Sequence, residues 1–459
     1  MLNRLVPSAI LALVVAETLL IVSAYVLAAY MLSSTDPMVW LLYEDGLIRI
    51  GVLVAGILFG LYLQDLYSDL RVGKRIALFQ QISLVIGLAF LMQALIGYGA
   101  PSLLLPRWIM MCGSLLLLAV LPLWRIVYGT LVEQGLAAER VLFLGANDIS
   151  LQVAEAVSER PELGLSVSGF VVEPEESERL GKWKRLGSVD EFRKIADTLR
   201  PDRVVVGMSE RRQKLPVLDL LDIKFSGVRV EEVAATFEAV FNRVCTQQLR
   251  PSQLIFSHEL GPRPGTLQIQ AAYSFALALI GVVLLAPLML IVAVIVRLTS
   301  PGPALYRQKR VGFNNEIFTV FKFRSMRQDA EAKSGAVWAT RDDPRITPLG
   351  KFLRKSRIDE LPQLFNVLRG EMSLVGPRPE RPEFVSTLSE KIPFYRQRHF
   401  VKPGITGWAQ INYKYGDTME DTIKKLEYDL YYIKNLTPAL DFYIMFHTVK
   451  VMLLSRGAQ

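Results

Sequence analysis

Four long runs of apolar residues fill the first third of the chain. They cover residues 5–32, 47–67, 76–98 and 103–128 and are separated by short polar loops. A helix of about 20 apolar residues crosses the hydrocarbon core of a bilayer, so each run predicts a membrane-spanning helix. The first run is too long, and too lightly charged at its start, for a typical cleaved signal peptide. Residues 1–135 are therefore predicted to form a four-helix transmembrane bundle.

The charges of the short loops predict how these helices are oriented. The loop at 31–45 holds three acidic residues and no Lys or Arg, whereas the loop at 68–75 holds three basic residues and one acidic residue. Because basic loops stay on the cytoplasmic side, the N-terminus, the second loop and everything after residue 130 are expected in the cytoplasm.

Glu17, Arg49 and Arg107 fall within or near the apolar runs. An ionisable residue inside a membrane is a functional candidate by default. For the two arginines the alternative is that the side chain reaches from the end of a span to the membrane surface. The pattern favours an anchor over a transport pathway.

From residue 139 the pattern changes to short strands that alternate with helices. Buried strands are predicted at 140–145, 165–172 and 202–206, and helices at 148–160 and 188–199. Such an alternation is typical of a parallel sheet with helices on its faces. Residues 136–265 are therefore predicted to form a Rossmann-like α/β module on the cytoplasmic side.

The turn after the first of these strands has the position of a dinucleotide fingerprint but only part of its sequence. Gly145 matches the first glycine, whereas Asn147 stands in place of the second. That second glycine lets the backbone approach a pyrophosphate. Asp148 would also place negative charge where a phosphate would lie. A structural or regulatory module is favoured over one that binds NAD tightly.

A fifth apolar run, at 271–298, contains Pro287 near its middle. Proline removes a backbone donor and clashes with the preceding turn, so it bends or breaks a helix. A helix that enters the membrane, bends at Pro287 and returns would keep the remaining chain in the cytoplasm. A kinked helix that crosses the membrane is the alternative. Residues 266–459 are predicted to form an α/β catalytic domain attached by this re-entrant helix.

The distribution of charge singles out this last domain. The chain has a net charge of +8, and residues 266–459 hold 27 basic and 17 acidic residues, a net charge of +10. Basic surfaces bind anionic lipid or phosphorylated ligands, and nucleic acid is not expected as the partner of a membrane-embedded chain. With two cysteines and three histidines in 459 residues, a disulfide framework and a Cys- or His-rich metal site are not expected.

Basic residues gather in two segments of the last domain, and each segment has two possible roles. Lys309 and Arg310 lie in one segment, and Lys322 and Arg324 lie in the other. Arg offers a planar fork and Lys a compact charge, and phosphate recognition uses both. A basic collar that faces lipid headgroups is the alternative.

Two adjacent carboxylates, Asp359 and Glu360, stand among Arg354, Lys355 and Arg357. Adjacent side chains on a helix project about 100° apart, so the two carboxylates are suited to different tasks. One can act as a nucleophile toward phosphorus, and the other as a ligand of Mg²⁺. The nearby cations are expected to keep Asp359 ionised. A surface face of ion pairs is the alternative.

Several ordered motifs resemble those of the bacterial sugar transferase family, the monotopic phosphoglycosyl transferases. They are Ser-Pro-Gly-Pro-Ala at 300–304, Lys-Phe-Arg-Ser-Met at 322–326, Asp-Glu-Leu-Pro-Gln at 359–363, Met-Ser-Leu-Val-Gly-Pro-Arg-Pro at 372–379 and Lys-Pro-Gly-Ile-Thr-Gly-Trp-Ala-Gln at 402–410. The four spans and the α/β module resemble the large subgroup that depends on polyprenyl phosphate. The segment 425–434 is similar to members that initiate exopolysaccharide synthesis.

The resemblance implies transfer of a sugar 1-phosphate from a UDP-sugar to undecaprenyl phosphate at the bacterial inner membrane, with release of UMP. It implies that Asp359 is the nucleophile, that Glu360 binds Mg²⁺ and that Pro287 breaks the membrane helix. Many members have Ser before that proline, where this chain has Ala286. A homodimer is expected by analogy. The expected phosphate-binding residues are Arg310, Lys322, Arg324, Arg354, Arg378 and Lys402.

Two other functions compete with this reading. The first is a membrane-anchored nucleotide-sugar oxidoreductase or epimerase that uses the middle module, and the degraded glycine fingerprint counts against it. The second is a non-catalytic membrane regulator whose middle module senses a nucleotide.

Overall fold

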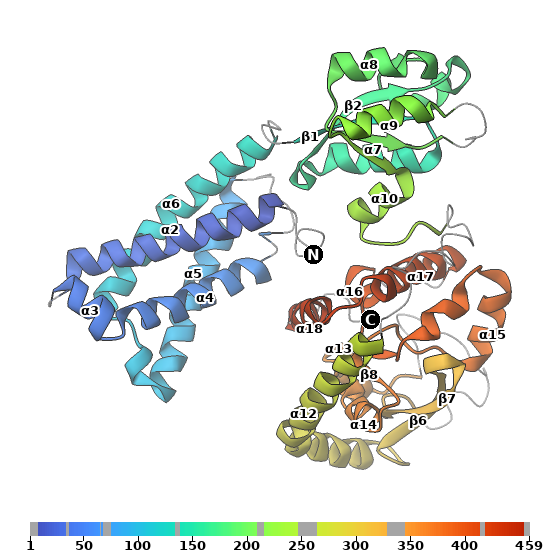
Figure 1. Cartoon of the computed structure of the whole chain (residues 1–459). Helices are drawn as coiled ribbons and strands as arrows, with labels where there is room; N and C mark the ends of the chain where they lie inside the picture. The colour runs from blue at the N-terminus through green and yellow to red at the C-terminus, as the bar shows by residue number, and fades with distance from the viewer. Residues whose placement is uncertain are drawn as a thin grey trace. The chain divides into compact units, whose positions relative to one another are not determined.

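The structure is a computed structural model. It describes residues 8–33, 36–64, 66–67, 75–133, 138–208, 215–246, 264–327, 345–413 and 418–453. The chain divides into two compact units, Met1–Val240 and Phe241–Gln459 (Figure 1). The predicted division into three domains at residues 135 and 265 remains a prediction.

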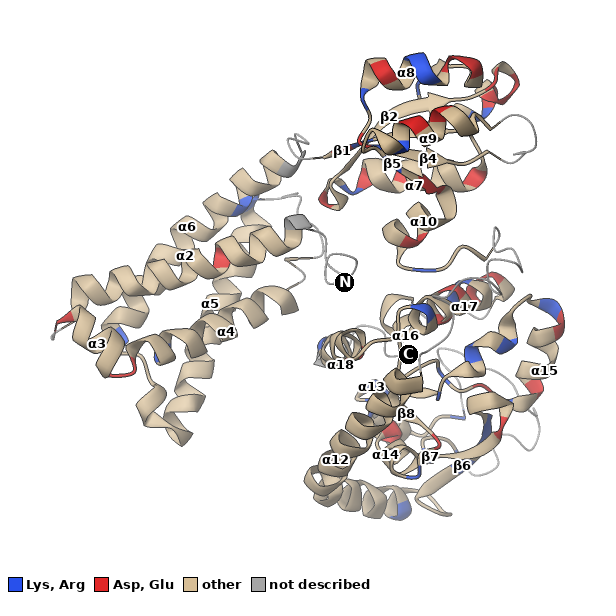
Figure 2. Cartoon of the chain, viewed as in Figure 1, with Lys and Arg blue, Asp and Glu red and all other residues tan. Residues whose placement is uncertain are grey.

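The first unit begins with the predicted apolar helices. They are α2 (Ser8–Leu32), α4 (Gly46–Leu63), α5 (Arg75–Gly99) and α6 (Arg107–Glu133), with the short helices α3 (Pro37–Tyr43) and η1 (Pro101–Leu103) between them. All four long helices are long and apolar enough to cross a membrane. Figure 2 shows few charged residues on them. The four predicted helical runs are confirmed, and the protein is a membrane protein with long apolar helices.

The three ionisable residues within or near the spans have partners in the bundle. Glu17 of α2 is fully buried and forms an ion pair with Arg125 of α6, at 2.6 Å between Oε1 and Nε. Tyr67 donates a hydrogen bond to the same carboxylate. Arg49 donates to the carbonyl of Leu104 at 3.4 Å, and the guanidinium of Arg107 lies over the ring of Trp108. The contacts of Glu17 and Arg49 join different segments of the bundle, whereas that of Arg107 lies within α6.

The second part of this unit is a parallel five-stranded sheet in the order β3-β2-β1-β4-β5. Its strands are β1 (Glu139–Leu144), β2 (Leu165–Val171), β3 (Arg185–Gly187), β4 (Arg203–Val206) and β5 (Arg229–Glu232). The connecting helices are η2 (Pro161–Leu163), η3 (Pro174–Leu180), η4 (Val189–Glu191), α7 (Asp148–Glu159), α8 (Phe192–Leu199), α9 (Val217–Phe225) and α10 (Val233–Phe241).

The predicted strands and helices of this part agree with the structure to within a few residues. The predicted helix at 188–199 is divided: Ser188 caps the 3-10 turn η4 through a capping box, and α8 follows directly. The central strands β1 and β4 are buried almost throughout. Apolar runs of this kind are typical of parallel strands that are covered on both faces.

The second unit begins its described helices with α12 (Pro264–Thr299), which contains Pro287. The hairpin of β6 (Leu305–Val311) and β7 (Ile317–Phe323) follows, and β8 (Ser373–Val375) pairs in parallel with β9 (Gly404–Thr406). Its other helices are η6 (Phe313–Asn315), α13 (Pro348–Lys355), η7 (Ile358–Glu360), α14 (Gln363–Leu368), α15 (Pro382–Lys391), η8 (Tyr395–Phe400), α16 (Trp408–Asn412), α17 (Met419–Lys434) and α18 (Pro438–Leu453).

The helix α12 is continuous through Pro287, but it is not straight. Figure 1 shows two arms that meet at a bend. Pro287 has no N–H to donate to the carbonyl of Val283, four residues earlier, which accounts for a bend in this region. Both arms pack on the second unit: Ala278 contacts the core around Leu364, and Val296 contacts the core around Phe323.

Candidate active site

The carboxylates Asp359 and Glu360 lie on the single-turn helix η7, between α13 and α14. Thr347 caps α13 by accepting a hydrogen bond from the N–H of Gly350, at 2.9 Å. The chain leaves α13 through Arg357, whose φ of 59° lies in the left-handed region, which is unusual for a side chain of this size. After this turn both carboxylates lie buried in the unit, where each is less than 10% exposed.

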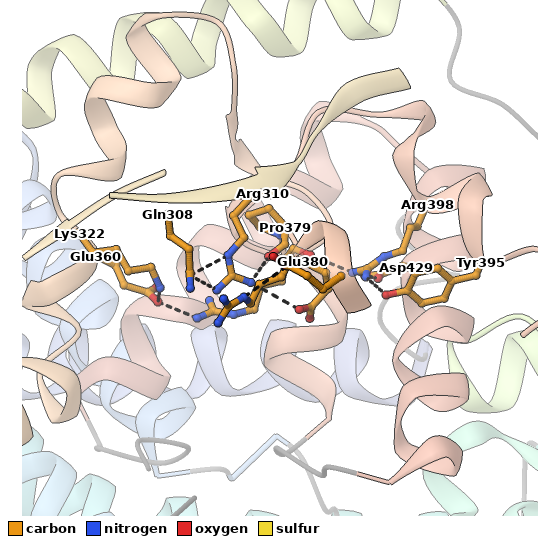
Figure 3. Close-up of polar contacts among 12 residues, drawn as sticks. Gln308, Arg310, Lys322, Glu360, Pro379, Glu380, Tyr395, Arg398 and Asp429 are labelled. Atoms are coloured by element: carbon orange, nitrogen blue, oxygen red, sulfur yellow. Dashed lines mark hydrogen bonds and ion pairs between the residues drawn. The ribbon is translucent and has the colours of Figure 1, made fainter. Parts of the chain in front are cut away.

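Glu360 is held by two cations from different parts of the sequence. Lys322 of β7 donates to Oε1 at 3.0 Å, and Arg378 donates to the same oxygen at 2.8 Å (Figure 3). Burial alone would raise the pKa of Glu360, but Arg378 and Lys322 outweigh it and hold that pKa well below the usual range. Glu360 is therefore a permanent anion in this site.

Asp359 differs from its neighbour although the two are adjacent in sequence. Its Oδ1 is buried and accepts no hydrogen bond from the described residues. Burial, and then the charge of Glu360, raise the pKa of Asp359 to about 6, while Lys322, Arg354 and Arg378 oppose the rise. Arg354 favours the ionised form, as expected of a nearby cation, but burial and the neighbouring anion have larger effects on the pKa. At neutral pH the carboxylate form predominates, and within the described ranges of the chain no donor bonds to its Oδ1.

Asn366 of α14 fixes the position of Lys322. Its side chain is fully buried, donates to the carbonyl of Thr319 at 2.7 Å and accepts from the N–H of Phe321 at 3.1 Å. These two bonds tie α14 to β7 at Thr319 and Phe321, just before Lys322 in the strand. Asn366 was not among the predicted site residues, although it lies only six residues beyond Glu360.

The other expected phosphate-binding residues have diverse surroundings. Arg354 donates through Nε to the Ser325 hydroxyl at 2.9 Å, and its charge acts on Asp359. Arg324 is buried and donates to the carbonyls of Ser300 and Pro301, so it holds the turn that follows α12. It does not join the cations around Glu360.

Arg310 and Lys402 also differ from Lys322 and Arg378, the two cations that bond directly to Glu360. Arg310 donates to the Gln308 side chain and to the carbonyl of Pro379. Nζ of Lys402 lies 3.6 Å from the position that a Cβ would take at Gly370. Among the described residues, no recorded hydrogen bond or ion pair joins either side chain to the carboxylate pair.

The donor groups of this site suit a magnesium ion that is held by two carboxylates together with substrate phosphates. The described residues contain no cluster of three or more His, Cys, Asp or Glu side chains. Mg²⁺ does not need one, because it commonly takes one or two carboxylates together with phosphate oxygens of a substrate. The buried, unpaired Oδ1 of Asp359 beside the ionised Glu360 supplies the negative charge that such an ion requires.

Comparison with known proteins identifies the family. Residues 266–455 match the family described as Bacterial sugar transferase. The chain is 35% identical over 342 residues to the UDP-glucose:undecaprenyl-phosphate glucose-1-phosphate transferase of Xanthomonas campestris pv. campestris, an alignment that covers 72% of this chain and 70% of that protein. The chain belongs to the bacterial sugar transferase family. The resemblance inferred from the motifs at 300–304, 359–363 and 402–410 is confirmed.

Two further relatives of this sugar transferase align with the chain over different fractions of their own length. A UDP-N-acetylgalactosamine-undecaprenyl-phosphate N-acetylgalactosaminephosphotransferase of Aeromonas hydrophila is 44% identical over 232 residues, 50% of this chain and 54% of that protein. The match thus spans about half the length of that relative. An exopolysaccharide production protein of Rhizobium leguminosarum bv. phaseoli is 41% identical over 196 residues, 42% of this chain and 98% of that protein.

In the first unit, side chains of the protein bond to the backbone N–H groups at the start of α7, where a dinucleotide fingerprint would bind a phosphate. Asn147 caps α7 by accepting from the N–H of Ser150 at 2.7 Å. The N–H of Ala146 donates to the carboxylate of Glu176 at 3.4 Å. An acidic side chain at this helix start would repel a phosphate, which agrees with the incomplete glycine fingerprint.

Proposed function

We propose that this sugar transferase moves a sugar 1-phosphate from a UDP-sugar to undecaprenyl phosphate, with release of UMP, as the first membrane step of exopolysaccharide synthesis. The observation that carries the proposal is the buried Oδ1 of Asp359, which accepts no hydrogen bond from the described residues. It lies near the cations Lys322, Arg354 and Arg378. The names of the Xanthomonas, Aeromonas and Rhizobium relatives supply the substrates and the pathway class.

The reaction proceeds in two displacements at one phosphorus atom. Oδ1 of Asp359 forms a bond to the β-phosphorus of the UDP-sugar, the bond to the oxygen that bridges to the α-phosphate breaks, and UMP leaves with that oxygen. An oxygen of undecaprenyl phosphate then forms a bond to the same phosphorus. The bond to Asp359 breaks, and its carboxylate is restored. A covalent relay lets one soluble and one lipid substrate use the same site in turn.

Charge neutralisation is the main task of the surrounding residues, because phosphoryl transfer depends on positioning and electrostatic stabilisation. Lys322 and Arg378 contact Glu360 in this structure and are placed to contact the diphosphate when it is bound. Glu360, with Asp359 beside it, would hold Mg²⁺, which supplies charge neutralisation at the diphosphate. Arg354 adds a third positive charge next to Asp359.

The helix α12 is proposed to enter the membrane and return to the same side. Near its start, Gln270 donates to the carbonyl of Val375 and to Asp441. At its end, Ser300 accepts from Arg324. Both ends are thus bonded to one folded unit, which a straight helix across a bilayer would not allow. The outward apolar residues of both arms would contact lipid, and they include Leu279, Ile280, Val283, Leu284, Leu290, Ile291 and Leu298.

With this topology, the N-terminus and the catalytic unit face the cytoplasm of a bacterial inner membrane. The first four apolar helices form the anchoring bundle. The strand order β3-β2-β1-β4-β5 is that of a doubly wound sheet and supports a Rossmann-like module. The contact between Ala146 and Glu176 favours a structural or regulatory role for this module over binding of a dinucleotide.

The test is release of UMP by the purified full-length chain in nanodiscs. A panel of UDP-sugars should be offered with and without undecaprenyl phosphate and Mg²⁺. We expect stoichiometric UMP and lipid-linked sugar diphosphate with at least one UDP-sugar when lipid and metal are both present. No UMP with any sugar of the panel, from protein that is folded and monodisperse, would contradict the proposal.

A further inference from the structure

A rigid turn carries Arg378, and its backbone is held by an unusual set of contacts. Pro377 and Pro379 flank Arg378 and have no N–H groups, so the turn can be fixed by backbone hydrogen bonds mainly through its carbonyls. The carbonyl of Pro377 accepts from the N–H of Gly404 at 3.0 Å, and the carbonyl of Glu380 accepts from the N–H of Val311 at 2.9 Å. The two carbonyls between them accept from arginine side chains.

These side chains are Arg310 and Arg398. Arg310 donates to the carbonyl of Pro379, at 3.0 Å. Arg398 of η8 donates through Nη2 to the carbonyl of Arg378, also at 3.0 Å. Four consecutive carbonyls, from Pro377 to Glu380, are therefore occupied.

Arg398 is buried, and its guanidinium has polar partners on two other side chains. It is 6% exposed, forms an ion pair with Asp429 of α17 at 2.8 Å and donates to the hydroxyl of Tyr395 at 2.8 Å. Asp429 is 2% exposed. Figure 3 shows these residues at one end of a row of polar contacts and the pair of Lys322 and Glu360 at the other. A buried guanidinium with a buried carboxylate partner has few alternative positions, so it can fix what it contacts.

We propose that Arg398, held by Asp429, is a positioning residue that sets the Arg378 guanidinium against Glu360. The connection is short: Arg398 holds the backbone of Arg378, and the side chain of Arg378 donates to Glu360 at 2.8 Å. In the part of the chain that the structure describes, neither Arg398 nor Asp429 bonds to Asp359 or Glu360, so they act through Arg378. This inference rests on the proposed function, because it assumes that Arg378 works at the transfer site.

A double-mutant cycle on the full-length chain tests this role. We expect Arg398→Gln to lower kcat/KM for UMP release about 10- to 100-fold, the size of effect that a misplacement of about 1 Å produces. Asp429→Asn should have a similar effect, and Arg398→Lys a partial one. If Arg398 acts through Arg378, the double variant with Arg378→Gln should be within about threefold of Arg378→Gln alone. Arg396→Gln, an exposed residue of the same helix, is the matched control and should keep wild-type kcat/KM.

A structural readout that does not depend on activity completes the experiment. Hydrogen–deuterium exchange of the peptide that covers 372–381 should be faster in Arg398→Gln and Asp429→Asn than in wild type and Arg396→Gln. Effects of Arg398→Gln and Arg378→Gln that multiply in the double variant, or wild-type kcat/KM in both Arg398→Gln and Asp429→Asn, would overturn the positioning role. An inactive wild type would instead overturn the proposed function. If Arg398→Gln does not fold, Asp429→Asn and Arg398→Lys provide the same cycle.

Discussion

The carboxyl of Asp359 is in an environment that disfavours its charge, although three cations surround it. Burial and the adjacent Glu360 raise its pKa to about 6, whereas Lys322, Arg354 and Arg378 oppose the rise. A carboxylate with a raised pKa is poorly solvated and therefore reactive toward phosphorus, and perturbed groups of this kind cluster at functional sites. Glu360, which is neutralised by two direct bonds, is suited to holding charge rather than to attacking.

Asp359→Asn should abolish covalent capture of the sugar phosphate. With UDP-sugar alone, intact-protein mass spectrometry should show wild type gaining the mass of one sugar phosphate, mapped to Asp359 by proteolysis. The amide is a very poor nucleophile, so the variant should show neither adduct nor transfer. Glu360→Gln should keep some adduct at high Mg²⁺ if its role is to hold the ion. Near-normal transfer by Asp359→Asn would restore direct attack by the lipid phosphate as the mechanism.

The same substitution should make the protein more stable at alkaline pH. The pKa of Asp359 is about 6 in the fold and 3.8 in a model peptide, so the folded state holds its proton more tightly. Its contribution to stability is therefore present below about pH 4 and is lost as pH rises through about 6. Relative to wild type, Asp359→Asn should raise the apparent Tm by a few degrees at pH 8 and by little at pH 4. Thermal scans in metal-free buffer measure this, and an equal shift at both pH values would contradict it.

At the scale of elements, α12 is the helix whose sequence and packing are most at odds with an ordinary span. Gln270, Ser274 and Ala278 recur every fourth residue on the buried face of its first arm, and Met289, Val292 and Val296 lie on that of the second. Ser274 hydrogen-bonds Ser373 at 2.9 Å. A helix surrounded by lipid would not form such polar bonds to a globular unit. Both arms therefore have one face that contacts protein.

Cysteine labelling should place both ends of α12 on one side of the membrane. In a background of Cys112→Ser and Cys245→Ser, Gly265→Cys and Thr299→Cys should resist an impermeant maleimide in intact cells and react in inverted vesicles. Ser102→Cys, in the loop predicted to lie outside, is the matched control and should react in intact cells. Labelling of Gly265→Cys and Thr299→Cys from opposite sides would show that α12 crosses the membrane.

At the scale of the whole molecule, the second unit begins before the segment that matches the family. It starts at Phe241, whereas the family match starts at residue 266. Asn242 accepts through its carbonyl from the Trp408 indole at 2.8 Å, and Thr246 donates to Glu427 at 2.8 Å. Glu427 is 6% exposed, so the hydrogen bond from Thr246 reaches a buried carboxylate of α17. The segment 242–246 is therefore part of the second unit.

Truncation at two positions should separate the roles of these parts. A fragment of residues 241–459 in nanodiscs should keep measurable transfer, because all the transferase motifs lie within it. A fragment of residues 266–459 should also be active but less stable by about 1–3 kcal/mol, since Glu427 loses its partners. Thermal stability and UMP release of the two fragments measure this. A well-folded but inactive 241–459 fragment would show that the first unit completes the site.

Features that depend on local order along the chain could be predicted from the amino-acid sequence. The number and length of the apolar runs, the alternation of strands and helices from residue 139, the bend-forming Pro287 and the adjacency of Asp359 and Glu360 are all one-dimensional properties. Run length relates directly to bilayer thickness, and two neighbouring residues stay neighbours in any fold. The family could be inferred for the same reason, since its motifs are contiguous.

The identity of the cations that meet the carboxylates, and the raised pKa of Asp359, could not be predicted without the folded structure. Lys322 and Arg324 are two residues apart and would share a face of a continuous strand, but β7 ends at Phe323, and Arg324 turns away to Ser300. Asp429 could have been noticed as a charge on the apolar stripe of α17, yet nothing in its neighbours indicates Arg398. Burial has the largest effect on the pKa of Asp359, and both this burial and the approach of Lys322 and Arg378 depend on segments far apart in sequence.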